Sequence, residues 1–263
     1  MKVLIKVGGS LLDDGASRSQ IAAQLVEVAR EYETVVVHGG GKQLTRFLES
    51  QGVTSAFVNG MRVSDAAVID GVTKVIAGSV NKNLVAALLA AGETAVGLSG
   101  IDGLLTSAVQ LAPEMEFVGE PVKTEGRLLD LLVNSGYLPV VACLAGNSEG
   151  VIFNVNADQM AVSCAAGWRA QKLIFLTDVP GVRNASGKVA AMLTPADAVD
   201  LIASGVAQGG MQAKLEACTL ALRSGIEEVI IAQGTDVKIC QRLLAGEAVG
   251  TRLLANAATA VNA

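Results

Sequence analysis

The polar side chains in loop-like settings form a mostly positive set with a few carboxylates and amides. They are Lys6, Lys42, Arg62, Asn154, Asn156, Asp158, Asp178 and Lys214. Such a set suits phosphoryl transfer, in which a protein mainly positions the reactants and neutralises charge. It suits best an acceptor that is already an anion, because a carboxylate with a pKa near ~4 needs no general base at neutral pH. The chain has a single histidine, so the scarcity of candidate bases agrees with this chemistry.

Lys6 is the most informative of these residues because it lies inside an apolar, strand-like run, VLIKVGG at residues 3–9. Two interpretations are open. A lysine at a sheet edge can extend its ammonium group into solvent along its aliphatic stem. Alternatively, the charge is partly buried and held in place for a phosphate group.

Glycine or small polar residues end three strand-like runs: GGS at 8–10, HGGGK at 38–42 and SGIDG at 99–103. Ligands of open α/β sheets bind beyond the carboxyl ends of the strands. Glycine lets the backbone approach a ligand, and N–H groups at the start of a following helix suit an anion such as phosphate. The alternative is that these are only tight strand–helix turns. Because three turns share the pattern, we favour a ligand site.

Three familiar motifs do not apply. The chain lacks G-x-x-x-x-G-K-[ST], and the glycines at 39–41 lack the G-x-G-x-x-G spacing, so neither a P-loop nor a dinucleotide fingerprint is predicted. GNSEG at 146–150 fits G-x-S-x-G, but a serine hydrolase needs a histidine later in the chain. The only histidine, His38, comes earlier.

Composition excludes other classes. Of 263 residues, 51% are hydrophobic and 17% charged, which is not the composition of a disordered chain. A net charge of −5 and 3% aromatic residues argue against nucleic-acid or anionic-lipid partners. The four cysteines show no C-x-x-C spacing and are expected as reduced core thiols of a cytoplasmic protein. Neither a signal peptide nor an apolar run of about 20 residues is evident.

Apolar runs of strand length alternate with helix-like segments. Strands are expected at 3–7, 34–37, 94–98, 138–142, 173–176 and 228–231. Helices are expected at about 18–31, 41–50, 65–90, 126–135, 157–167, 196–204, 210–224 and 236–244. The strand runs are continuously apolar, which is typical of strands covered on both faces. The alternation predicts an α/β fold with a mainly parallel sheet.

Smaller features interrupt this alternation. The segments 104–110 and 117–122, separated by Pro113, are predicted to form a β-hairpin. The segments 58–63 and 151–155 are predicted to be similar β-hairpin segments outside the main sheet. Ser64 is the expected N-cap of the helix at 65–90.

Seven motifs, in order along the chain, resemble those of the amino acid kinase family. They are VLIKVGG at 3–9, VHGGG at 37–41, NGMRVSD at 59–65, FNVNAD at 153–158, LTDVPGV at 176–182, GGMQAK at 209–214 and GTRL at 250–253. The resemblance runs from about residue 2 to residue 254. Single motifs are moderately specific, whereas the ordered set is strongly specific. NGMRVSD at 59–65, the arginine loop, and FNVNAD are most similar to the branch of the family that phosphorylates N-acetyl-L-glutamate.

The resemblance implies an open three-layer αβα sandwich and the reaction ATP + N-acetyl-L-glutamate → ADP + N-acetyl-L-glutamyl 5-phosphate, a step of arginine biosynthesis, with Mg²⁺ carried by the nucleotide. It also implies a role for each matching residue. The implied catalytic residues are Lys6, Lys214 and Asp158, with both lysines also on the nucleotide's phosphates. The implied acceptor-binding residues are Gly39, Gly40, Arg62 and Asn154. The implied nucleotide-side residues are Gly8, Gly9 and Asp178.

The resemblance further implies two halves: residues 1–170 for acyl-glutamate binding and dimerisation, and residues 171–263 for ATP. Because the first strand begins at about Lys2, we expect no helix ahead of it of the kind that interlaces dimers in the arginine-inhibited branch. The expectation is a cytoplasmic homodimer that free arginine does not inhibit. Its contact is expected on an apolar stripe of the long helix at 66–91, and the alternative is that this stripe packs within one subunit. The stripe consists of Val68, Val72, Val75, Ile76 and Ser79.

Alternatives remain within and beyond this reaction. FNVNAD differs from the corresponding element of the aspartate, uridylate and carbamate kinases. Another N-acyl-glutamate, such as N-succinylglutamate, stays possible as the acceptor. A carrier-linked aminoadipate is less suited, because an acidic carrier calls for a basic surface and residues 209–215 hold only Lys214. A non-catalytic metabolite sensor is disfavoured because Lys6, Asp158 and Lys214 are all present.

Overall fold

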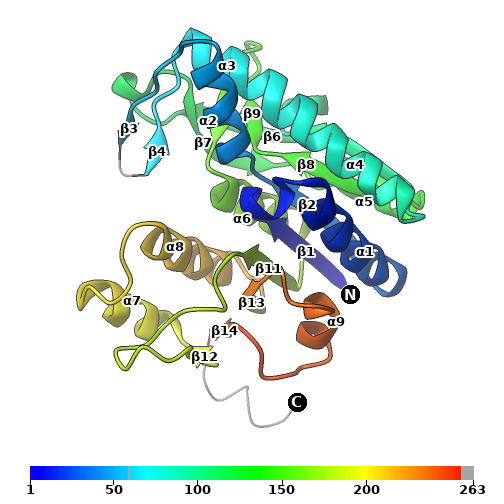
Figure 1. The fold of residues 1–263 in the computed structure, drawn as a ribbon, viewed down its shortest axis with the longest axis vertical. Helices are drawn as coiled ribbons and strands as arrows, with labels where there is room; N and C mark the ends of the chain where they lie inside the picture. The colour runs from blue at the N-terminus through cyan, green and yellow to red at the C-terminus, as the bar shows by residue number, and fades with distance from the viewer. Residues whose placement is uncertain (59, 256–263) are drawn as a thin grey trace.

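An eight-stranded sheet forms the middle layer of the protein (Figure 1). The structure is a computed structural model that describes residues 1–58 and 60–255. The strand order of the sheet is β12 (Met192–Leu193), β14 (Thr251–Leu254), β13 (Glu228–Gln233), β11 (Lys172–Thr177), β1 (Lys2–Val7), β2 (Glu33–His38), β8 (Leu138–Ala142) and β5 (Ala95–Ser99). β14 runs antiparallel to β13, and β12 runs parallel to β14. These two edge strands therefore run in the direction opposite to the other strands, which are parallel to one another. The predicted α/β class with a mainly parallel sheet is confirmed.

Helices cover both faces of this sheet. One face carries α1 (Gly15–Glu31), α3 (Ala66–Val72), the π-helical segment η2 (Thr73–Val80), α4 (Asn81–Ala90) and α9 (Ile239–Leu244), with α2 (Gly41–Ser50) against η2. The other face carries α5 (Arg127–Asn134), α6 (Ala157–Trp168) and α8 (Gly210–Arg223), with α7 (Pro195–Ala203) beside α8. The central strands are therefore covered on both sides, which explains their continuous apolar sequence: Val3, Leu4 and Ile5 are fully buried.

A small closed barrel and a short hairpin lie beside the sheet. The barrel contains β6 (Thr106–Gln110), β7 (Val118–Thr124), β9 (Leu144–Gly146) and β10 (Ile152–Val155). The hairpin pairs β3 (Phe57–Val58) with β4 (Met61–Arg62). Within the described residues there are also three single turns of 3₁₀ helix: η1 (Gly9–Leu12), η3 (Asp102–Leu104) and η4 (Pro113–Met115). The β-hairpin segments predicted at 104–122, 58–63 and 151–155 are confirmed, because each contains a strand paired with an antiparallel neighbour.

The six predicted sheet strands are all present, and the edge strands β12 and β14 are additional. Three local predictions are wrong. The helix at 65–90 contains the π-helical segment η2, and its N-cap is Asp65, whose side chain accepts from Val68 N–H, rather than Ser64. The last predicted helix begins at Ile239, because Lys238 adopts a left-handed conformation with φ +57°.

The apolar stripe predicted as a dimer contact faces the interior of this chain. Val68, Val72, Val75 and Ile76 are at most 6% exposed, and this helix packs against α2 and the turn after β2. The prediction of the contact surface is therefore wrong for these four residues, whereas Ser79 is exposed. Periodicity alone could not separate the two cases, because an apolar stripe looks the same whether a second layer or a second subunit covers it.

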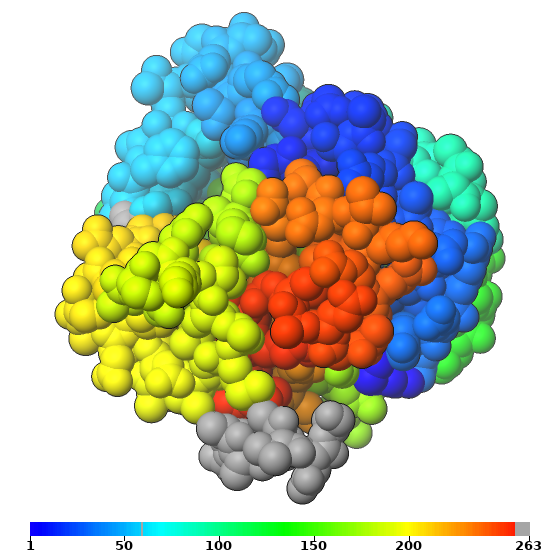
Figure 2. All heavy atoms as spheres, turned by 60° about the horizontal axis from the view of Figure 1, so that its bottom comes forward, coloured from blue at the N-terminus to red at the C-terminus, as the bar shows by residue number. Residues whose placement is uncertain are grey.

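The two ends of the molecule hold different parts of the chain. In Figure 1, α2, α3 and the β3–β4 hairpin lie at the top, and α7, α8, β12 and β14 lie at the bottom. Figure 2 shows the yellow, orange and red surface of the C-terminal part, with the light-blue lobe of the N-terminal part above it. All four cysteines are buried and free, as expected. No helix in the described ranges combines the length and apolar character needed to cross a bilayer.

Candidate active site

Lys6, Asp158 and Lys214 meet at the carboxyl ends of the central strands. Lys6 Nζ lies 2.8 Å from Asp158 Oδ1, and Lys214 Nζ lies 2.7 Å from Asp158 Oδ2. The three side chains are only 10–15% exposed. Lys6 is in register with Val37 of β2 and Phe175 of β11, so it is not on an edge strand. The interpretation of Lys6 as a partly buried charge is the one that the structure supports.

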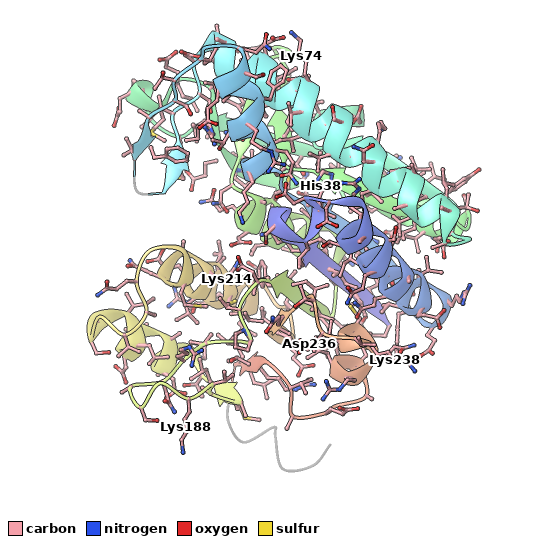
Figure 3. The ribbon with its side chains drawn as sticks, viewed as in Figure 1. His38, Lys74, Lys188, Lys214, Asp236 and Lys238 are labelled. Carbon is pink, nitrogen blue, oxygen red and sulfur yellow. The ribbon has the colours of Figure 1, made fainter. Side chains whose placement is uncertain are left out.

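The fold brings these three side chains together at a switch point of the sheet. α1 leads from β1 to β2 over one face, whereas α6 leads to β11 over the other face. In open α/β sheets, the crevice where the connections diverge is the usual ligand site. Lys214 reaches it from the second turn of α8 (Figure 3), with its Nζ 5.1 Å from the centre of the Phe175 ring. Lys6 reaches the same crevice from the carboxyl end of β1.

Asp158 is held at the start of α6 by its neighbour Asn156. The Asn156 side chain caps this helix by accepting hydrogen bonds from the N–H groups of Asp158 and Gln159, at 2.9 and 3.3 Å. A carboxylate in the first helical turn is also favoured by the helix dipole. Asn156 was among the polar residues noted in the sequence, but its cap role depends on where α6 begins, which sequence spacing leaves uncertain by a residue or two.

The charges of this triad are strongly coupled. Burial raises the pKa of Asp158, but the charges of Lys6 and Lys214 outweigh burial and lower it to about 2. Asp158 is therefore a carboxylate at every pH near neutrality, and it is poorly suited to accept a proton. Two lysines against one carboxylate leave a surplus positive charge, which suits a phosphate group.

Two glycine turns pack together beside the triad. Gly8 N–H donates to Leu176 O at 2.9 Å, which fixes the first turn against β11. A Cβ on Gly9 would lie 3.4 Å from the backbone of Gly40, and one on Gly39 would lie 3.2 Å from the Ala157 side chain. The turns after β1 and β2 thus lie against each other and against the start of α6, and a Cβ on Gly39 would be tight against Ala157. This is the arrangement expected for backbone groups that face a ligand.

The third glycine turn does not join this site. It follows β5, which is the far edge strand and is separated from β2 by β8. Its Asp102 accepts hydrogen bonds from the N–H and hydroxyl groups of Ser99 at 2.6 and 2.9 Å. The interpretation as a tight turn is correct here, and a shared glycine pattern misled because strand order is not visible in sequence.

Arg62 is buried beside the second turn without a carboxylate. Its guanidinium donates to the Ser55 hydroxyl, to Thr45 Oγ1 at 2.6 Å and to Gly41 O at 3.5 Å, and it lies 4.5 Å from the Phe57 ring centre. Burial lowers its pKa, whereas the more distant charge of Glu49 raises it. Ion pairs among the described residues do not include Arg62. A buried guanidinium held by neutral partners suits an anionic ligand.

Asn154 is connected to the arginine loop through Ser64. Its Nδ2 donates to Ser64 Oγ at 3.0 Å, and that hydroxyl donates to Arg62 O at 3.0 Å. Ser64 is fully buried, so its role is to connect the strand β10 with the arginine loop rather than to cap a helix. The structure thus links Asn154 to the backbone of Arg62, although 92 positions separate the two residues in sequence.

Asp178 stands apart from the other predicted residues. It follows β11, is exposed, and accepts a hydrogen bond from Thr177 Oγ1 at 3.2 Å. Its position at the carboxyl end of β11 places it on the same edge of the sheet as Lys6. No group of three or more His, Cys, Asp and Glu side chains suited to a metal ion occurs in the described residues.

A cavity of about 820 Å³ lies elsewhere, among β7, α5 and α6. Lys2, Asp130 and Trp168 line it. Lys2 is at the amino end of β1, opposite the end that carries Lys6, so this cavity is not the site of the triad. We place the candidate site by its charged groups and glycine turns rather than by cavity size.

Comparison with known proteins agrees with this geometry. A profile of the amino acid kinase family matches residues 1–233. An acetylglutamate kinase of Solibacter usitatus is 52% identical over 255 residues, covering 97% of this chain and 99% of the relative. An acetylglutamate kinase of Koribacter versatilis is 40% identical over 259 residues, with the same two coverages.

Solved structures share the fold. N-acetylglutamate synthase from Neisseria gonorrhoeae, complexed with coenzyme A and N-acetyl-glutamate, is 26% identical with a TM-score of 0.86. The match covers 97% of this chain but 60% of the synthase chain. Carbamate kinase from Giardia lamblia bound to AMP-PNP is 17% identical with a TM-score of 0.72 and shows the fold alone. By sequence profile, relatives and fold, this chain belongs to the amino acid kinase family.

Proposed function

We propose that this protein transfers the γ-phosphoryl group of ATP to the side-chain carboxylate of N-acetyl-L-glutamate, giving N-acetyl-L-glutamyl 5-phosphate and ADP, as a step of arginine biosynthesis. The observation that carries the proposal is the buried Lys6–Asp158–Lys214 group beside two close-packed glycine turns. Relatives that are called acetylglutamate kinase match nearly the whole chain, and they supply the identity of the acceptor.

Lys6 and Lys214 are the charges that meet the transferred phosphoryl group. A carboxylate oxygen of the acceptor attacks the γ-phosphorus, and negative charge spreads over the phosphoryl oxygens in the transition state. Two ammonium groups fixed beforehand by Asp158 stabilise that charge without further reorganisation. Asp158 orients both lysines through its two oxygens. No proton has to leave the acceptor, because a carboxylate is already ionised.

The acceptor lies along the second glycine turn and the arginine loop in this proposal. The Arg62 guanidinium pairs with the α-carboxylate, for which its planar pair of donors is well shaped. Asn154 donates to the acyl-amide end, and the backbone of Gly39 and Gly40 contacts the side-chain carboxylate. Support comes from the burial of Arg62 without an acidic partner and from the link through Ser64.

The nucleotide lies on the other side of the triad. The backbone of Gly8 and Gly9 contacts its phosphates together with both lysines, and Asp178 lies on the nucleotide side. We propose that Mg²⁺ arrives with ATP as part of the substrate. Residues 1–170 then bind the acceptor and form a homodimer, and residues 171–263 bind ATP. The proposed compartment is the cytoplasm.

An acceptor series tests the reaction. ADP release is measured with N-acetyl-L-glutamate, N-succinyl-L-glutamate and carrier-linked aminoadipate in turn, and also without any acceptor. The proposal predicts ADP release that depends on N-acetyl-L-glutamate and is fastest with it. Faster turnover with another acceptor would change the substrate, and binding of both ligands without ADP release would make the protein a sensor.

A further inference from the structure

The chain's single histidine lies in a buried hydrogen-bond chain beneath the second glycine turn. His38 ends β2 and is fully buried. Its Nδ1 lies 2.8 Å from Gly39 O, and its Nε2 lies 3.0 Å from Asn81 Nδ2. Asn81 is also fully buried, and its Nδ2 donates to Val140 O at 2.9 Å. Nothing in the proposed reaction uses these two side chains.

The partners of this chain settle where each proton lies. Gly39 O and Val140 O can only accept, so His38 Nδ1 and Asn81 Nδ2 must donate to them. Asn81 Oδ1 accepts from Lys82 Nζ at 3.0 Å, which fixes the orientation of the amide. The second proton of Asn81 Nδ2 then points at His38 Nε2, which must accept. His38 is therefore a neutral ring with its proton on Nδ1, and burial lowers its pKa to about 4.

This arrangement controls one peptide plane of the turn. Gly39 O and Gly40 N–H belong to the same trans peptide group, so they point in opposite directions. With the carbonyl held by His38, the Gly40 N–H faces away from the histidine. Gly40 N lies 3.4 Å from where a Cβ on Gly9 would be, so this peptide group lies against the first glycine turn. It makes no hydrogen bond to another described residue, although Gly40 is buried.

The π-helical segment η2 places the amide that holds the histidine. η2 ends at Val80, directly before Asn81. Ile76 and Val80 from the same segment lie 3.3 and 3.2 Å from where a Cβ on Gly40 would be. The wide turn thus brings two apolar side chains over Gly40 and the Asn81 amide over His38. Such π-helical segments are costly and occur often at functional sites.

We propose that His38 and Asn81 are positioning residues that fix the Gly39–Gly40 peptide, so that the Gly40 N–H is presented to the acceptor carboxylate and the transferred phosphoryl group. The proposal rests on the proposed function for what the N–H binds. Figure 3 shows His38 beside the long helix that contains Asn81, whereas Lys214 comes from α8 in the other half. Neither His38 nor Asn81 is a catalytic residue, since each acts only through the backbone of the turn.

Nitrogen NMR of the wild-type protein tests the geometry directly, because one histidine gives one pair of ring-nitrogen signals. At neutral pH the proposal predicts a protonated Nδ1 and an unprotonated Nε2. This is the less common tautomer of a free histidine, so the result is informative. A proton on Nε2, or a rapid mixture of both tautomers, would overturn the proposal.

Two matched variants test the function of the bond to Gly39. His38→Asn can place an amide N–H near the position of Nδ1, whereas His38→Gln places its amide near Nε2 and leaves Gly39 O without a donor. We expect His38→Gln to lower kcat/KM for N-acetyl-L-glutamate by about 10²-fold and His38→Asn by less than about tenfold. KM for ATP should change by less than about threefold in both. Equal losses in the two variants would contradict the proposal.

A measurement that needs no turnover tests the positioning role of His38 independently of the proposed reaction. The Gly40 amide resonance should move in His38→Gln and in Asn81→Leu, and stay near its wild-type position in His38→Asn. A wild-type protein without acceptor-dependent ADP release would overturn the proposed function alone, while this resonance would still decide whether His38 sets the peptide. An unchanged Gly40 amide in His38→Gln would overturn the positioning role whatever the reaction is.

Discussion

At the scale of single residues, the charged residues of the site could be predicted from residue type, context and family resemblance, whereas the residues beneath the second glycine turn could not. Lys6 was conspicuous because a lysine inside an apolar strand calls for an explanation, and its ion pair with Asp158 is that explanation. His38 and Asn81 gave no such signal. A histidine and an asparagine between apolar residues have many possible partners, and only the fold, which places Asn81 at the start of α4 beside His38 at the end of β2, selects one.

Lys214→Ala should lower turnover by about 10²–10³-fold, because it removes one fixed positive charge from the transferred phosphoryl group. Lys6→Ala should have an effect of the same order. The exposed Lys74→Ala is the control, since Lys74 pairs only with Asp70 on the surface and should keep wild-type turnover. Steady-state kinetics with both substrates saturating measures the effect. Turnover of Lys214→Ala within threefold of wild type would remove Lys214 from the mechanism.

Asp158→Asn should be inactive across the whole accessible pH range. The variant loses the group that orients both lysines, and a higher pH cannot restore it, because the pKa of Asp158 is already lowered to about 2. A pH–rate profile from mildly acidic to alkaline conditions checks this. Activity that recovers as the pH rises would instead indicate general-base catalysis by another group.

The stability of the protein should fall as the pH drops from about 6.5 to about 4. Burial lowers the pKa of His38 to about 4, with Lys6 and Lys82 acting in the same direction and the bond to Gly39 opposing them. In this window the unfolded chain takes up a proton that the folded chain does not, so the free energy of unfolding falls as the pH drops. Urea unfolding at several pH values measures it. His38→Asn should remove most of this dependence, and an unchanged slope would contradict the assignment.

At the scale of elements, prediction was reliable where local sequence decides and unreliable where neighbours decide. The apolar runs gave the central strands almost to the residue, because burial on both faces leaves no alternative pattern. The π-helical turn of η2 could not be predicted from local sequence, and its Ile76 and Val80 pack on Gly40, which is far from them in sequence. Strand order was equally hidden, which is why the glycine turn after β5 was wrongly grouped with the other two.

Gly40→Ala and Gly41→Ala form a matched pair that tests the second glycine turn. A Cβ on Gly40 would lie 3.2 Å from Val80 Cγ2, whereas one on Gly41 meets nothing within 4 Å. We expect Gly40→Ala to displace the turn and lower kcat/KM for the acceptor by about tenfold or more, since small misplacements of reacting groups are costly. Gly41→Ala should stay near wild type. Similar kinetics for both variants would mean that the turn tolerates displacement.

Arg62→Lys tests the arginine loop as an acceptor-binding element. Lysine keeps the charge but loses the planar pair of donors. KM for N-acetyl-L-glutamate should rise by about tenfold or more, while KM for ATP stays within about threefold. Thermal unfolding serves as a check on folding, because Arg62 also contacts Thr45 and Ser55. Equal increases in both KM values would indicate a structural role for Arg62 instead.

At the scale of the whole molecule, the proposed function puts the acceptor and the nucleotide on opposite sides of one group of charges. Lys6 comes from the strand between the two sides, Asp158 from α6, and Lys214 from α8. The α/β class with a mainly parallel sheet could be predicted from the alternation of strands and helices, and the three-layer arrangement from the family resemblance. The homodimer and its lack of inhibition by arginine stay predictions, which light scattering and assays in millimolar arginine check, and the surface that forms the dimer could not be read from the apolar stripe.

The central claim is that the acceptor's own carboxylate attacks the phosphoryl group. The most direct measurement supplies N-acetyl-L-glutamate with ¹⁸O in its side-chain carboxylate, traps the product with hydroxylamine, and determines the isotope content of the released phosphate. Attack by the carboxylate makes one of its oxygens the bridge of the acyl phosphate, and that oxygen leaves with the phosphate when hydroxylamine attacks the carbonyl carbon. The account predicts one ¹⁸O in each phosphate, whereas phosphate without ¹⁸O would mean transfer to water and would contradict it.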